Sequence, residues 1–418
     1  MSTTVEPPGA PARAPRITSI DAVRGLVMFT MIFVNDIAGV SPDIVPAWMR
    51  HYKGRSGMTF VDMVFPAFLF IVGMSIPFAL GGRLRAGEKW WKTILHVMGR
   101  TLSLLFIGIL MVNDESPGSD MSGMSPTLWS VLMFLSAILA FCSISPPLAR
   151  GRAWPWIGCA VRGLGLCGMV ALAFMFRGDK GQRIISLSPF AIHTEWYGIL
   201  GLIAWAYCAG SVVYLTFRAN ALPLLGCVVL LLGLYPADRT GLFDNVWLGR
   251  YVGIGDTLGA LPSITVAGLL LASILVAPEK SSPARIARFT LLYLLGFAAA
   301  ALLFNGLYGI NKNQATPSWC LWACAITAAL WLILHGLCDR APASRLAKVL
   351  AMAGQNVLLA YLISEMLPSA LDLLHLANRY DALAGGSLAT AIARSAGCAV
   401  VILAVTAGLN RAGFRLKL

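Results

Sequence analysis

A polar stretch early in the sequence contains the side chains best suited to acid–base chemistry. His51 precedes Asp62 by eleven residues, and Asn35 and Asp36 stand upstream of both. An imidazole titrates near neutral pH, so it can take a proton from an attacking group or attack a carbonyl itself. A carboxylate would orient the ring, and an amide could donate to a developing oxyanion. We therefore predict a catalytic site of His51, Asp62, Asn35 and Asp36, with Asp62 the first choice to orient the imidazole and Asp36 the second.

Each of these residues also has an ordinary explanation. A histidine in a loop is commonly solvated, and an acid at the start of a helix is favoured by the helix dipole. A site is favoured because four polar groups collect between two apolar stretches, each long enough to cross a membrane.

The chain around these residues has the composition of a membrane protein. It has 418 residues, of which 58% are apolar and 12% charged, whereas a soluble protein carries about 25% charged residues. About 20 apolar residues cross a hydrocarbon core. The alternation that β-barrel strands need is not visible. The sequence therefore predicts an all-α polytopic membrane protein with about twelve transmembrane helices, within a range of roughly 10–12.

The predicted spans divide the chain into a short tail and one membrane domain, residues 18–418. The seventh span below is short enough to be re-entrant, and Pro368 is expected to interrupt the eleventh. Residues 1–17 are rich in Pro and Ala and lack the features of a removed signal peptide, so they predict a disordered cytoplasmic tail. The spans are expected at 20–38, 60–82, 93–113, 126–146, 155–176, 195–217, 220–236, 257–277, 286–308, 317–338, 346–368 and 388–410.

Positive charge is concentrated on one side of these spans. Lys and Arg dominate one set of loops and both ends of the chain, for example at Arg83, Arg85, Arg411 and Arg415, whereas the other loops are acid-rich. Because excess Lys and Arg mark the cytoplasmic side, both termini are predicted to be cytoplasmic and His51 to lie on the outer face. Cytoplasmic loops also account for the net charge of +13, so we expect no nucleic-acid partner.

Two arginines, Arg24 and Arg100, fall within or at the end of predicted spans. A charge in such a place needs a partner or a water-filled cavity, and both explanations stay open. Lys312 and Asn313 form a polar group just before the span at 317–338. The nine cysteines lie in or beside apolar stretches without a CxxC spacing, so no metal site is predicted.

Two motifs in the first two spans resemble a known family. Ser19–Leu26 with Val34–Asn35, and then Gly57–Gly73, resemble the opening of the heparan-α-glucosaminide N-acetyltransferase family, nearest to its bacterial, NagX-like branch. Weaker similarity continues at Leu261–Ile264 and Asn311–Asn313. The resemblance spreads over most of the chain but is dense only between residues 18 and 80.

The resemblance implies a transmembrane acetyltransferase. Such an enzyme takes acetyl from cytoplasmic acetyl-CoA and delivers it to the amine of a glucosamine-type sugar on the outer face. The family's key histidine corresponds to His51, and its companion amide and carboxylate correspond to Asn35 and Asp62. A bacterial member would lie in the inner membrane, with the His51 loop in the periplasm.

CoA carries phosphates, which need cations. We expect Arg24 and Arg100 to bind them, with Arg83 and Arg85 as further candidates, and Lys312 with Asn313 to contact the reacting end of acetyl-CoA or the acceptor. The lipid bilayer is the remaining partner, and a homodimer is left open.

Other functions remain as alternatives. Many spans and intramembrane arginines also suit a transporter of amino sugars or N-acetylglucosamine, and a scaffold or sensor of the cell envelope is a third reading. Within the enzyme reading, the residues do not decide between direct transfer and an acetyl-histidine intermediate.

Overall fold

The computed structural model describes residues 17–115, 123–145, 154–178, 181–187, 190–192, 197–276, 282–339 and 345–418. This part of the chain is built almost entirely of helices, so the prediction of an all-α polytopic membrane protein is confirmed. The predicted tail at 1–17 lies outside the described residues except for Ile17.

A long loop follows the first helix. In chain order the helices are α1 (Thr18–Ile37), α2 (Val64–Arg85), α3 (Trp90–Asp114), α4 (Pro126–Ala140), α5 (Trp154–Met175), α6 (Gly198–Phe217), α7 (Ala221–Arg239), α8 (Leu261–Val276), α9 (Pro283–Tyr308), α10 (Pro317–Cys338), α11 (Arg345–Ala353), α12 (Val357–Leu373), α13 (Ala377–Ala382) and α14 (Leu388–Arg411). Shorter helical turns are η1 (Ala47–Met49), η2 (Val61–Met63), η3 (Trp247–Arg250) and η4 (Ile254–Ala260).

Within the described residues, nine helices are long and apolar enough to cross a membrane. They are α2 with η2, α3, α5, α6, α7, α8 with η4, α9, α10 and α14. They include α7, the seventh predicted span, which the sequence alone left as a possible re-entrant segment. Three further helices, α1, α4 and α12, occupy the other expected positions without meeting that criterion. The count of about twelve spans and the side of the termini therefore stay predictions.

The eleventh predicted span is interrupted at a different place from the one expected. Pro368 lies inside α12, which continues through it, and the break falls at residues 354–356, between α11 and α12. A proline removes one backbone donor without necessarily ending a helix. Gly354 is under a stronger constraint, because a Cβ there would lie 2.1 Å from the backbone oxygen of Asp21. Asn356, with φ −137° and ψ 51°, then restarts the chain as α12.

The strands are short and form two antiparallel pairs. The predicted span at 126–146 ends as a helix at Ala140, and β1 (Cys142–Ile144) follows it. It pairs antiparallel with β4 (Phe414–Leu416), and β2 (Ile185–Leu187) pairs with β3 (Phe190–Ile192).

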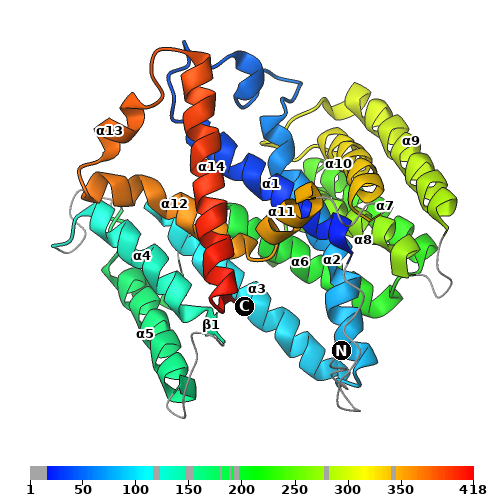
Figure 1. The fold of residues 1–418 in the computed structure, drawn as a ribbon. Coiled ribbons are helices and arrows are strands. Elements are labelled where there is room, and N and C mark those ends of the chain that lie inside the picture. Colours follow the sequence, from blue (N-terminus) through cyan, green and yellow to red (C-terminus); the bar gives the residue numbers. More distant parts are fainter. Residues whose placement is uncertain are drawn as a thin grey trace, which may run out of the picture.

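The centre of the bundle is held by helices that approach at glycines. Figure 1 shows α4 and α5 as a pair on one side, α9 and α10 on the other, and α1 and α2 between them. At the contact of α2 with α8, a Cβ on Gly73 would lie 1.8 Å from the backbone oxygen of Thr265, and one on Gly268 would lie 2.0 Å from that of Phe70. Small residues allow this closeness, as is typical of membrane helices. This core fixes α2, which continues from the turn η2 that contains Asp62.

Candidate active site

The loop between α1 and α2 is folded against the turn between α9 and α10. The backbone amide of Gly57 donates to the carbonyl of Ile310 at 2.8 Å, and the amide of Ile310 donates to Ser56 Oγ at 3.0 Å. These two bonds join segments far apart in the sequence. They bring the turn that carries Lys312 beside the loop that carries His51.

His51 and Asp62 form the predicted pair. His51 Nδ1 lies 2.8 Å from Asp62 Oδ1. The other carboxylate oxygen accepts from the amides of Tyr52 at 3.1 Å and Thr59 at 3.0 Å. The Asp62 side chain is only 3% exposed, whereas that of His51 is 49% exposed. A fixed, buried carboxylate therefore orients an imidazole that remains accessible.

Lys312 completes this group. Its Nζ lies 3.1 Å from His51 Nδ1 and 3.8 Å from Asp62 Oδ1. A carboxylate accepts and an ammonium donates, so Nδ1 can serve only one of them at a time. The shorter distance favours a proton on Nδ1 that is donated to Asp62, which leaves the lone pair on Nε2. Burial lowers the pKa of the Lys312 ammonium below its ordinary value, and the charge of Asp62 offsets part of that shift.

The three residues border a cavity of about 640 Å³, here called the outer cavity after the side of the membrane that the sequence predicts for His51. The space is within the range of ligand pockets in proteins. Asn313, which was predicted together with Lys312, also lines it. The remaining described lining residues are Tyr52, Lys53, Gly54, Arg55, Gly57 and Asn311.

The structure does not join Asn35 to His51. Asn35 Nδ2 donates to Glu365 Oε1 at 2.8 Å, and both side chains line a separate cavity of about 160 Å³ beside α3 and α6. The expected cluster of four is corrected at this point, because the amide meets a carboxylate of α12 instead of the imidazole.

Asp36 is also engaged elsewhere. It accepts from Ser395 Oγ at 2.6 Å, pairs with Arg394 at 3.1 Å and accepts from the Tyr380 hydroxyl. The Arg394 side chain is buried, so this ion pair ties the C-terminal end of α1 to α14. Asp36 therefore does not join the pair of His51 and Asp62 in this structure, and Lys312 stands where a further polar group was expected.

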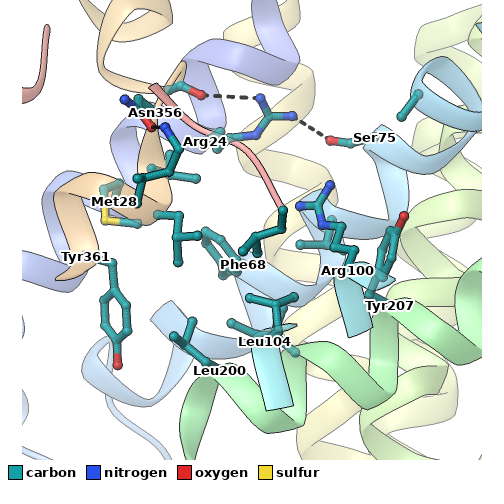
Figure 2. Close-up of a pocket in the computed structure, with 18 of the residues that line it drawn as sticks. Arg24, Met28, Phe68, Ser75, Arg100, Leu104, Leu200, Tyr207, Asn356 and Tyr361 are labelled. Atoms are coloured by element: carbon teal, nitrogen blue, oxygen red, sulfur yellow. Dashed lines mark hydrogen bonds between the residues drawn. The ribbon is translucent and has the colours of Figure 1, made fainter. Parts of the chain in front are cut away.

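Arg24 and Arg100 line a second large cavity, here called the inner cavity, of about 540 Å³ (Figure 2). Arg24 pairs with Asp21 at 2.8 Å and donates to Ser75 Oγ at 2.6 Å. The guanidinium of Arg100 lies 4.8 Å from the Tyr207 ring centroid, and its buried Nε has no hydrogen-bond partner among the described residues. This cavity adjoins the ends of α2 and α3 that lie away from His51.

The charged side chains that line the inner cavity are cationic, and two of them are paired with acids: Arg24 with Asp21 and Arg83 with Glu88. Arg83, His96 and Lys417 line it as well, and none of its described lining residues is Asp or Glu. Arg83 was among the predicted phosphate ligands, whereas Arg85 is absent from this lining and Lys417 was not foreseen. The expected set for acetyl-CoA is thus divided, with Arg24 and Arg100 in the inner cavity and Lys312 and Asn313 in the outer one.

The two cavities are stacked along α2. Phe68 lines the inner cavity and follows Asp62 by six residues. At about 1.5 Å of rise per residue this is roughly 9 Å along the helix. Within the described residues, no group of three His, Cys, Asp or Glu could hold a metal ion.

Comparison with known proteins gives a family and two partial relatives. A family described as "Domain of unknown function (DUF5009)" matches residues 16–241. The heparan-alpha-glucosaminide N-acetyltransferase of Homo sapiens is 33% identical over 104 residues, which are 25% of this chain and 15% of the relative. Its counterpart from Mus musculus is 31% identical over 115 residues, 28% of this chain and 17% of the relative. The chain thus matches less than a fifth of the length of either relative.

Proposed function

The chain belongs to the DUF5009 family, and on that premise we propose that it is a transmembrane acetyltransferase. It would move acetyl from cytoplasmic acetyl-CoA to the amine of a glucosamine-type sugar at the outer face. One observation carries the proposal: an accessible imidazole paired with a buried carboxylate in the outer cavity, next to a second cavity whose charged side chains, among the described residues, are all cationic. The names of the two relatives support the same reaction class.

In this proposal the outer cavity performs the acyl transfer. The acceptor nitrogen attacks the thioester carbonyl while Nε2 of His51 takes its proton. Asp62 holds the ring and offsets the positive charge of the imidazolium. Lys312 lies close enough to His51 for its ammonium to stabilise the oxyanion of the tetrahedral intermediate, a contribution of about 3 kcal/mol in comparable sites. The intermediate collapses, the C–S bond breaks, and the thiolate leaves with a proton from the imidazolium.

The inner cavity would hold the anionic part of acetyl-CoA. Arg24, Arg83 and Arg100 offer guanidinium groups, which suit phosphate oxygens. Ser75, which accepts from Arg24, lies thirteen residues after Asp62, so the pantetheine arm has to cover roughly 20 Å along α2. We propose direct transfer, in which donor and acceptor meet at His51, over a route through acetyl-histidine.

The same scheme places the protein in the inner membrane of a bacterium. The charge asymmetry of the loops supports cytoplasmic termini and a periplasmic His51 loop. Acetyl-CoA would then arrive from the side of the inner cavity and the sugar from the side of the outer cavity.

Purified protein in detergent tests the reaction. Labelled acetyl-CoA and glucosamine should give labelled N-acetylglucosamine without any vesicle, which a pure transporter cannot do. His51→Asn keeps a donor toward Asp62 but removes the base, so we expect the rate to fall at least about 100-fold. His375→Asn, at an exposed histidine outside both cavities, is the matched control. Wild-type transfer no faster than background would overturn the proposal.

Single turnover separates the two routes. Labelled acetyl-CoA without acceptor should leave no label on His51 if transfer is direct. A labelled peptide containing residues 50–53 would instead establish the acetyl-histidine route.

A further inference from the structure

A short strap, residues 413–418, forms part of the inner cavity. Its strand β4 pairs with β1, so that Leu416 faces Cys142 and Phe414 faces Ile144. The amide of Lys417 donates to the carbonyl of Phe141 at 2.9 Å, and the amide of Ser145 donates to the carbonyl of Gly413 at 2.9 Å. One edge of the strap is therefore held by the segment that follows α4.

Asn356 holds the other edge. Its Oδ1 accepts from the amide of Leu416 at 3.3 Å, and its Nδ2 donates to the carbonyl of Phe414 at 3.4 Å. Asn356 is buried and stands at the break between α11 and α12. Its side chain thus satisfies the backbone groups on the free edge of β4, as a neighbouring strand would, through two long hydrogen bonds.

The strap closes over cationic residues. Leu416, Lys417 and Leu418 line the inner cavity together with Arg24 and Arg100. In Figure 2 its coil crosses the view between the labelled Arg24 and Phe68. The backbone of this wall is held by a three-residue ribbon on one edge and by the two long hydrogen bonds of Asn356 on the other, and a short two-stranded ribbon is only marginally stable by itself.

We propose that the strap is a movable wall of the inner cavity and that Lys417 on it contacts the anionic part of the occupant. The inference rests on the proposed function, in which that part is the phosphate groups of CoA. Arg100 supports an anionic occupant independently, because its buried Nε lacks a hydrogen-bond partner among the described residues. The anion would then join a cation of the strap to cations of α1, α2 and α3, and closing of the strap would be coupled to binding.

The pairing of β1 with β4 offers a reversible lock. The backbone hydrogen bonds between the strands join residue 417 to 141 and residue 145 to 413. Hydrogen-bonded and non-hydrogen-bonded pairs alternate along an antiparallel ladder, so Cys142 and Leu416 form a non-hydrogen-bonded pair, the kind in which side chains are closest. A cysteine at position 416 would therefore be within disulfide reach of Cys142. Leu416→Cys can be oxidised before or after CoA is added.

The order of addition is the test. Oxidation before addition should slow the association of labelled CoA at least about tenfold, oxidation after addition should slow its release, and reductant should reverse both effects. Oxidised wild type and Cys142→Ser combined with Leu416→Cys are the controls. Equal association and release rates in the locked and reduced protein would overturn the movable wall.

Lys417 is tested without the lock. Lys417→Met should weaken CoA about tenfold and leave pantetheine, which lacks phosphate, unchanged. Arg415→Met removes the same charge from a strap residue outside the cavity lining, and it should stay within about twofold of wild type. Equal CoA affinity of Lys417→Met and wild type would overturn the contact while the proposed function stood. Failure of the wild type to bind CoA would overturn the proposed function and the occupant with it.

Discussion

Asp62 binds His51 with one carboxylate oxygen and the backbone of His51's own loop with the other. Oδ1 lies 2.8 Å from His51 Nδ1, and Oδ2 accepts from the amides of Tyr52 and Thr59. The hydroxyl of Thr59 also donates to the carbonyl of Arg50 at 2.8 Å, which closes the base of the loop. The residue that orients the imidazole is therefore also the one that shapes its surroundings.

Asp62→Asn should separate these two tasks. The amide oxygen can still accept from the backbone, so we expect the loop to fold. The amide cannot offset the imidazolium charge, so the transfer rate should fall at least about 100-fold, given losses near 10⁴ in a comparable triad. Initial rates in detergent measure this, and CoA binding should be unchanged. Asp43→Asn, at an exposed carboxylate of the same loop, is the control. A rate within threefold of wild type would remove Asp62 from the mechanism.

The lowered pKa of Lys312 predicts how the transfer rate falls at alkaline pH. Because burial lowers its pKa, Lys312 loses its proton at lower pH than an ordinary lysine. Its positive charge is fully present below that pKa and is lost as the pH rises through it, so transfer should slow in the same direction. Lys312→Arg stays charged, and its alkaline limb should lie at least about one unit higher. Lys53→Arg, in the same cavity, should leave the limb in place. Coincident limbs for wild type and Lys312→Arg would contradict the role.

Arg100 should contribute to CoA affinity through its charge and hydrogen bonding, beyond its contact with Tyr207. Arg100→Met removes a guanidinium whose Nε is buried without a partner among the described residues, so we expect CoA to bind about tenfold more weakly, since a charge-assisted hydrogen bond contributes roughly 1.5–3 kcal/mol. Isothermal titration measures it. Arg239→Met is the matched control, because Arg239 lies over Tyr235 as Arg100 lies over Tyr207 but outside the inner cavity. Equal losses in both variants would argue for a packing effect alone.

The contact between α2 and α8 predicts a stability difference. Gly73→Ala places a methyl group against the backbone of Thr265, and overpacking of this kind costs about 1–3 kcal/mol. Gly99→Ala on α3 meets open space and should be neutral or slightly stabilising. Thermal unfolding in detergent compares the two variants. A melting temperature of Gly73→Ala equal to that of Gly99→Ala would show that α2 and α8 can move apart.

Sidedness can be measured at the outer cavity. Lys53→Cys places a thiol on an exposed residue of the loop, so an impermeant maleimide should label it in intact cells. The same label applied to Arg85→Cys, at the opposite end of α2, should require lysis. Labelling of Lys53→Cys only after lysis would reverse the proposed orientation.

The parts predictable from sequence are those with a short-range signal. Helices follow from runs of apolar residues, and His51 with Asp62 from two polar groups eleven residues apart in one loop. The sequence predicts a contact of Lys312 with the cofactor or the acceptor. Its contact with His51 has no local signal, because the two residues are 261 positions apart in the chain. Asp36 looked available because its partner Arg394 is 358 residues distant. The break at 354–356 was missed for the same reason, since the backbone that demands Gly354 belongs to α1.

The contact of Gly25 with Gly354 has a mechanical consequence. A Cβ on either glycine would lie 2.1 Å from a carbonyl oxygen of the other segment, so the two backbones touch. Such a contact resists sliding of the two segments past each other, because a side chain larger than hydrogen has no room at either glycine. Asn356 stands beside this contact, whereas Glu365 lies roughly 14 Å further along the helix. α12 is thus tied to α1 at two places, by a backbone contact before its first residue and by the hydrogen bond of Glu365 to Asn35 further along, so the two helices are held as one unit.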